Sequence, residues 1–132
     1  MVAFNFKARF APLIGAGVKR QTIRPKVRAK PGDELQLYTA LRTKACCKLL
    51  EPDPICISVD RCIVGPDCVT IGDVELRGGE ADAFAMRDGF ENYRELADWF
   101  CATHGAQLFI GYLHVWALAS SAKPFRSGRA II

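Results

Sequence analysis

The sequence predicts an α+β protein: a small, mostly antiparallel β-barrel of about five or six strands, with two or three helices flanking a cleft. Three observations lead to this prediction. The chain has 132 residues, half of them hydrophobic, which suits one domain with a packed core. Segments with strand patterning occupy both ends of the chain. Two segments with helical patterning precede the last strand.

The predicted strands lie mainly in the first part of the chain. Residues 4–10 and 34–38 alternate apolar and polar side chains, which is the period of a half-buried strand. Residues 12–17 are predicted to form one helical turn that a glycine ends. Turn-forming Pro and Gly residues separate further apolar runs, which predict strands over residues 46–50, 55–64 and 68–76.

Helical signals follow. Residues 80–87 have helical composition, and Asn92 followed by Glu95 resembles a capping box at the start of an amphipathic helix. Gly105 is placed to end that helix. A final strand is predicted over residues 108–116. The chain is thus expected to form a single domain over residues 1–120, followed by a basic C-terminal tail over residues 121–132.

The formal net charge is +4, and its distribution along the chain is uneven. Residues 1–32 contain eight Lys or Arg and no acidic residue, whereas residues 49–122 contain four basic and twelve acidic residues. A basic surface of this kind indicates a polyanionic partner such as nucleic acid, and a solvated basic face is the alternative.

The six cysteines are expected to be reduced thiols, because the N-terminus lacks the charged-then-apolar order of a signal peptide. We expect a soluble, cytoplasmic protein with no membrane contact, since no apolar run approaches about 20 residues. Cys101 and His104 have the spacing of a helical metal pair, but no second pair lies at a typical distance. No metal and no cofactor is expected.

The segment over residues 17–24, Gly-Val-Lys-Arg-Gln-Thr-Ile-Arg, carries the most chemical information. In an extended segment Thr22 and Arg24 point to the same face, and Lys19 lies just before them at the bend. An amine, a hydroxyl and a guanidinium would then converge on one spot. A solvated basic loop remains the alternative interpretation.

The pattern Gly-x-Lys-x-x-Thr-x-Arg in this segment resembles the signature of the ASCH domain family, a branch of the PUA-like β-barrels that is linked to RNA. The resemblance extends over about residues 4–118. At residues 38–44 it is strongest to the phage and bacterial members of the family. Four further segments support it: residues 31–35 (PGDEL), 38–44 (YTALRTK), 88–90 (DGF) and 109–113 (FIGYL).

The resemblance implies a cleft between barrel and helices that accepts a nucleoside, nucleotide or RNA. One bacterial subgroup of the family hydrolyses acetylated cytidine with a Lys and a Thr from the signature and an acidic residue before a helix. Carried over by motif, these are Lys19, Thr22 and Asp88. The subgroup has Glu where this chain has the shorter Asp88, so Glu91 is the alternative acidic residue.

The resemblance therefore predicts an amidohydrolase that acts on acylated cytidine. Thr22 would attack the acyl carbonyl, and Lys19 would accept its proton if its pKa falls below about 10.4. Asp88 would orient or protonate the leaving amine. Arg24 would bind phosphate or stabilise the oxyanion.

A non-catalytic RNA- or nucleotide-binding module and a single-strand-specific ribonuclease are the alternatives. In the binding module, cations would hold phosphates and Tyr38 would stack on a base. We expect a monomer or weak dimer whose partner is a nucleoside or RNA. The predicted binding residues are Arg20, Arg24, Lys26, Tyr38, Arg42 and Lys44.

Other conspicuous side chains are interpreted as structural. Trp99 and Phe100 have helical core spacing, and His104 lies in the last turn of the predicted helix, where a cation favours the helix dipole. His114 is interpreted as a surface or hydrogen-bonded histidine of the last strand. Trp116 is interpreted as a packing residue, with a base-stacking platform as the alternative.

Overall fold

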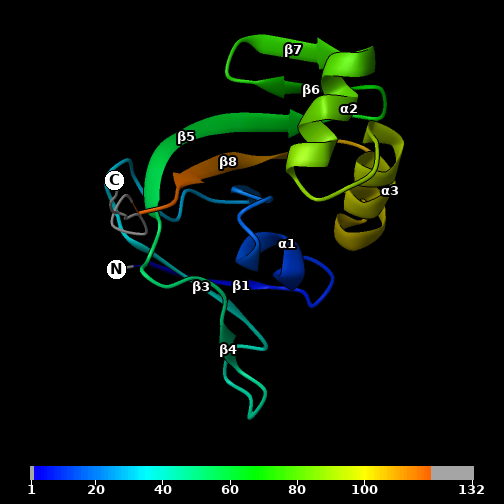
Figure 1. Ribbon diagram of the computed structural model, residues 1–132. Coiled ribbons are helices and arrows are strands. Elements are labelled where there is room, and N and C mark those ends of the chain that lie inside the picture. The colour runs from blue at the N-terminus through cyan, green and yellow to red at the C-terminus, as the bar shows by residue number, and fades with distance from the viewer. Residues whose placement is uncertain (1, 120–132) are drawn as a thin grey trace.

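The computed structural model describes residues 2–119, which form an α+β fold of eight strands and three helices (Figure 1). The predicted basic tail therefore lies outside the described residues. The elements in chain order are β1 (Val2–Phe6), α1 (Ala11–Gly15), β2 (Gln21–Arg24), β3 (Leu35–Thr39), β4 (Cys47–Lys48), β5 (Ile55–Val64), β6 (Cys68–Ile71), β7 (Val74–Arg77), α2 (Gly78–Arg87), α3 (Tyr93–His104) and β8 (Phe109–Ala117).

The larger sheet has five antiparallel strands in the order β2-β8-β5-β6-β7. Its long curved strand β5 pairs with β8 along most of its length, as Figure 1 shows. On the other side of β8, Thr22 of β2 pairs with His114. A side chain at Gly111 of β8 would place its Cβ 2.5 Å from the Arg24 carbonyl oxygen, so glycine is what allows β2 to lie this close.

The smaller sheet has the order β1-β3-β4, with β1 and β3 parallel. One bridge, between Glu34 and Ile55, joins it to the larger sheet. Within residues 2–119 no pairing closes the two sheets into one barrel, which differs from the predicted barrel. The mostly antiparallel character of the prediction is confirmed.

The strand count exceeds the predicted five or six because residues 68–76 form a hairpin of two strands and because Gln21–Arg24 forms a strand of its own, β2. Gly72, with a φ of 58°, turns the chain between β6 and β7 in a conformation that favours glycine. At the N-terminus the alternating pattern over residues 4–10 also overextends the strand. Strand β1 ends at Phe6, and the chain turns there into α1.

The signals for α3 are confirmed by the structure. The Asn92 side chain accepts a hydrogen bond from the Glu95 backbone N–H at 2.9 Å, which satisfies a free donor of the first turn. Gly105 ends the helix in the left-handed conformation, with a φ of 71°. Among the described residues, no helix has the length and apolar character needed to cross a membrane.

Candidate functional site

A cavity of about 210 Å³ opens between β2, the end of α2 and helix α3. Three of the predicted site residues, Lys19, Thr22 and Asp88, line it together with Arg24. Its volume lies below the roughly 300–1,000 Å³ of sites for drug-sized ligands, so it accommodates a small group such as a single heterocyclic base. The site residues come from two parts of the chain that are more than sixty residues apart.

Lys19 and Asp88 form a buried ion pair at this cavity. The Lys19 Nζ lies 3.2 Å from Asp88 Oδ1 and donates to the Asp88 backbone oxygen at 2.5 Å. Only 3% of the Lys19 side chain and 5% of the Asp88 side chain are exposed. Lys19 also lies over the Phe10 ring, 4.9 Å from its centroid. The ammonium group is thus held by polar contacts on one residue and shielded by an aromatic ring.

Gly89 packs closely against the side chains that surround the Lys19–Asp88 pair. Asp88 caps the C-terminus of α2, and Gly89 follows it with a φ of 99°, a value that favours glycine. A Cβ at Gly89 would lie 3.4 Å from the Lys19 side chain and 3.1 Å from Phe10. A residue with a side chain at position 89 would therefore crowd Phe10 and adopt a strained backbone conformation.

Burial shifts the pKa values of both members of the pair so that their uncharged forms become more favourable. Desolvation lowers the pKa of Lys19 below 10.5, and the charge of Asp88 opposes this effect. Desolvation likewise raises the pKa of Asp88 above 3.8, against the charge of Lys19 and hydrogen bonds from Gln21 and Lys19. The environment thus favours a lysine amine and a carboxylic acid more than water would.

Thr22 faces the cavity beside Arg24, as the extended segment predicts. The Thr22 Oγ1 accepts a hydrogen bond from Arg24 Nε at 3.1 Å, and Thr22 is buried. Because the guanidinium donates to this oxygen, the hydroxyl hydrogen remains free to be donated elsewhere. A cation on the oxygen also stabilises any negative charge that develops there.

Arg24 itself is held firmly in place. Its Nη2 donates to the Asn5 backbone oxygen at 2.9 Å, and its guanidinium lies over the rings of Phe4 and Phe6 at 5.0 and 4.9 Å. Burial, with a smaller effect of Arg28, lowers the pKa of Arg24 to about 10, so the group stays charged at neutral pH. These contacts use the Arg24 guanidinium to hold Thr22 and the cavity wall, which leaves less of it for binding a phosphate.

Aromatic side chains also line the cavity, and the sequence pattern did not identify them as site residues. Phe10, Phe90 and Trp99 pack edge to face or tilted, with ring centroids 5.5 to 5.8 Å apart, and all three line the cavity. The prediction that Trp99 packs is confirmed, but its ring also faces the cavity. Helical spacing alone cannot separate a core face from a cavity wall.

The remaining predicted binding residues do not line this cavity. Arg20 lies at a different cavity, and its Nε donates to the Gly17 backbone oxygen at 2.7 Å. Lys26, Arg42 and Lys44 are exposed. The residues predicted to bind but found outside the cavity are Arg20, Lys26, Tyr38, Arg42 and Lys44.

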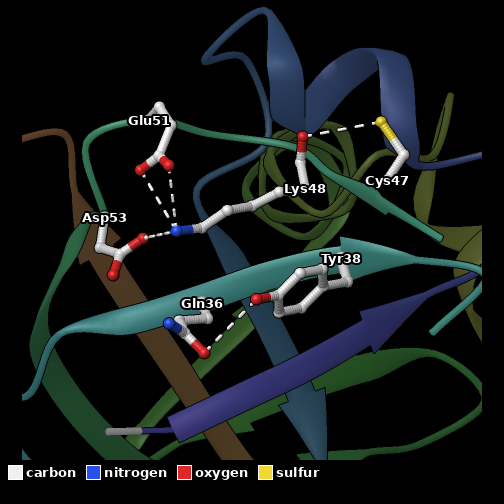
Figure 2. Close-up of polar contacts among 6 residues, drawn as sticks. All are labelled: Gln36, Tyr38, Cys47, Lys48, Glu51 and Asp53. Carbon is white, nitrogen blue, oxygen red and sulfur yellow. Dashed lines mark hydrogen bonds and ion pairs between the residues drawn. The ribbon is translucent and has the colours of Figure 1, made fainter. Parts of the chain in front are cut away.

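Tyr38 points along the smaller sheet rather than into the cavity. Figure 2 shows its hydroxyl directed at Gln36, to whose Oε1 it donates at 3.5 Å. The neighbouring Lys48 amino group lies between Glu51 and Asp53 in the same view, at 3.2 and 2.8 Å. Because Glu51 and Asp53 offset the charge of this lysine, the surface beside Tyr38 does not carry a row of unpaired cations.

Glu91, His114 and Trp116 do not line the cavity. Glu91 is exposed and absent from the cavity, so Asp88 is the acidic residue that meets Lys19. His114 is fully buried, so the surface alternative is wrong; its Nε2 accepts from the Arg28 backbone N–H at 3.0 Å, whereas its Nδ1 has no hydrogen-bond partner within residues 2–119. Trp116 is buried against Phe6 and offers no stacking platform.

His104 lies at the far end of the cavity, where its ring stacks on Phe100 at 5.5 Å. Burial lowers its pKa below 6.5, so the neutral ring is favoured at neutral pH. His104 does lie in the last turn of α3, as predicted, and burial opposes rather than favours its charged form. Within residues 2–119, no group of three or more His, Cys, Asp or Glu is arranged to hold a metal ion, and the six cysteines are free thiols.

Comparisons with protein-family models, with curated proteins and with solved structures found no match to this chain. The functional argument therefore rests on the geometry and chemistry of the cavity.

Proposed function

We propose that this chain is an ASCH-type domain of the PUA-like group and that its cavity hydrolyses the acyl group from the exocyclic amine of cytidine. The observation that carries the proposal is the convergence of Lys19, Thr22 and Asp88 on one small cavity with an aromatic wall. A flat, polar heterocycle suits such a cavity, because aromatic side chains favour contact with a base and the same lining supplies charged and hydroxyl groups.

The reaction begins with Thr22. A threonine hydroxyl attacks a carbonyl only when a base takes its proton. Lys19, in its neutral amine form, accepts that proton while the Thr22 oxygen forms a bond to the acyl carbon. The burial that lowers the pKa of Lys19 makes this form more accessible than it is for a solvated lysine.

The second step releases cytidine. The C–N bond breaks, and the exocyclic nitrogen takes a proton from protonated Asp88 or from the ammonium of Lys19. Water then hydrolyses the ester on Thr22, which returns the free hydroxyl and liberates the carboxylic acid. Arg24 stabilises the Thr22 oxygen through the hydrogen bond that its Nε donates at 3.1 Å.

Turnover of acetylcytidine by two variants at position 22 tests the proposal. Thr22→Val removes the hydroxyl and keeps the branched shape, whereas Thr22→Ser keeps the hydroxyl. We expect Thr22→Val to lower kcat/KM at least about a hundredfold and Thr22→Ser to retain most of the activity. Equal turnover by Thr22→Val and the wild-type chain would reject Thr22 as the nucleophile.

RNA binding at the same cavity is the second candidate, and one contact favours it. The Asn5 side chain lines the cavity and its Oδ1 accepts from the Leu41 backbone N–H at 2.8 Å. This contact ties the turn that precedes the exposed Arg42 and Lys44 to a residue that lines the cavity. A strand entering the cavity could extend across that turn, where the two cations would neutralise phosphates.

The two candidates respond differently to substitution. If RNA is the ligand, Arg42→Ala and Lys44→Ala each weaken binding of an unstructured oligonucleotide and reduce the salt dependence of affinity by about one phosphate contact. Neither variant changes turnover of free acetylcytidine. Cleavage of unpaired RNA that disappears in Thr22→Val would instead identify a ribonuclease.

A further inference from the structure

Gln21 is a buried polar side chain whose amide meets the Lys19–Asp88 pair. It lies in β2, and because side chains alternate along a strand, it belongs to the face opposite to Thr22. Its Nε2 donates to Asp88 Oδ1 at 3.1 Å, and the Lys19 Nζ lies 3.2 Å from the same oxygen. Two donors from one short segment thus converge on a single carboxylate oxygen.

Gln21 does not reach the cavity that Lys19 and Thr22 line. Its side chain lies instead at a second, mainly apolar cavity of about 480 Å³, beside Leu113 and Val115 of β8. A ligand in the smaller cavity therefore meets Asp88 and not Gln21. Any effect of Gln21 on chemistry must pass through the carboxylate that it holds.

We propose that Gln21 is the positioning residue of the Lys19–Asp88 pair: its amide, from behind the cavity wall, fixes the Asp88 carboxylate in the orientation that meets Lys19. The effect of Gln21 on turnover rests on the proposed function. Its effect on the Asp88 carboxylate does not depend on that function. A carboxylate at the end of a helix can rotate about its Cα–Cβ and Cβ–Cγ bonds. A second donor on Oδ1 removes that freedom, and burial of the amide without a partner would be costly.

The variant Gln21→Met tests the proposal, because methionine has a similar length and shape and lacks the N–H donors. Without the hydrogen bond, ionised Asp88 is less stabilised and its pKa rises further. A carboxylate that is less often charged also raises the pKa of Lys19 less, so the acid limb of kcat/KM moves to lower pH. The other charged or titratable groups that face the pair, Arg9, Arg24 and Cys62, are unchanged in this variant.

Two measurements on the free protein keep the test independent of catalysis. In the wild-type chain, the side-chain amide protons of Gln21 should shift in NMR spectra with the same midpoint as the Asp88 carboxyl carbon. In Gln21→Met, the Asp88 midpoint should move to higher pH. The matched control is Val115→Ala, which alters the strand partner of Gln21 and leaves the amide in place.

For turnover we expect Gln21→Met to lower kcat by about ten- to a hundredfold with little change in KM, because misplacement of a reacting group acts on the chemical step. A shifted Asp88 midpoint in a chain that does not hydrolyse acetylcytidine would support the positioning role and reject the proposed reaction. If the Gln21 amide of the wild-type chain does not follow Asp88, or if Gln21→Met and Val115→Ala shift Asp88 equally, the proposal is overturned.

Discussion

Lys19 and Lys48 both pair with carboxylates, yet the two pairs differ in almost everything except distance. Lys19 lies 3.2 Å from Asp88, and Lys48 lies 2.8 Å from Asp53 and 3.2 Å from Glu51. The Lys19 side chain is 3% exposed, whereas that of Lys48 is 26% exposed. Since the lysine–carboxylate distances are similar, the comparison isolates the effect of burial on a lysine–carboxylate pair.

The pKa values of the two lysines move in opposite directions. Burial lowers the pKa of Lys19, because the desolvation of the ammonium outweighs the attraction of Asp88. Hydrogen bonds and charges from Asp53 and Glu51 raise the pKa of Lys48. A short lysine–carboxylate distance therefore does not by itself predict a well-charged lysine, and only the buried pair has the properties of an acid–base couple.

The largest expected difference between the pairs is in stability. Lys19→Met leaves Asp88 buried without its cation, and we expect the free energy of unfolding to fall by about 3–5 kcal/mol. Lys48→Met should lower the urea midpoint much less, because the Lys48 and Glu51 side chains are 26% and 70% exposed and partly solvated pairs contribute little to stability. Urea unfolding followed by circular dichroism measures both. Similar midpoints for the two variants would contradict the structural distinction between the pairs.

Titration should separate the two lysines next. The folded pKa of Lys19 lies below 10.5, so the folded chain binds fewer protons there than the unfolded chain, and its contribution to stability increases as pH rises through that window. The folded pKa of Lys48 lies above 10.5, so its contribution is complete below 10.5 and is lost as pH rises through the folded value. NMR of labelled lysine side chains measures the two midpoints. A higher midpoint for Lys19 than for Lys48 would refute this assignment.

The smallest expected effect is that of salt. Raising the ionic strength from about 0.1 M to about 1 M shortens the screening length from about 10 Å to about 3 Å. The partly exposed Lys48 pairs should respond, with the midpoint of Lys48 moving back toward 10.5. The buried Lys19–Asp88 pair should titrate almost unchanged, because solvent ions do not enter between its members. Equal salt sensitivity of the two lysines would indicate that solvent reaches the cavity pair.

The two pairs also differ in how far the sequence predicts that their members lie close together. Lys48 meets Glu51 three residues later, a separation that a short turn spans, so proximity along the chain is already informative. Lys19 and Asp88 are 69 residues apart, and only the resemblance of two separate motifs linked them. Their partner Gln21 carried no such signal, because a single amide in an extended segment is unremarkable until its neighbours are known.

Local chemistry in the sequence determined the elements that depend on neighbouring residues. Asn92 and Gly105 bound α3, residues 55–64 form a strand with those limits, and Thr22 and Arg24 share a face. Each of these features requires only a capping side chain, a permitted dihedral angle or a two-residue period.

Tertiary structure decided the features that depend on burial and on distant partners. The pairing of strands into two sheets, the aromatic wall at Trp99 and the dry environment of Lys19 all arise from packing between remote segments. The same residue types that make an ordinary solvated pair at Lys48 become a candidate acid–base couple at Lys19. The physical reason is desolvation, which depends on the whole fold and which no local pattern encodes.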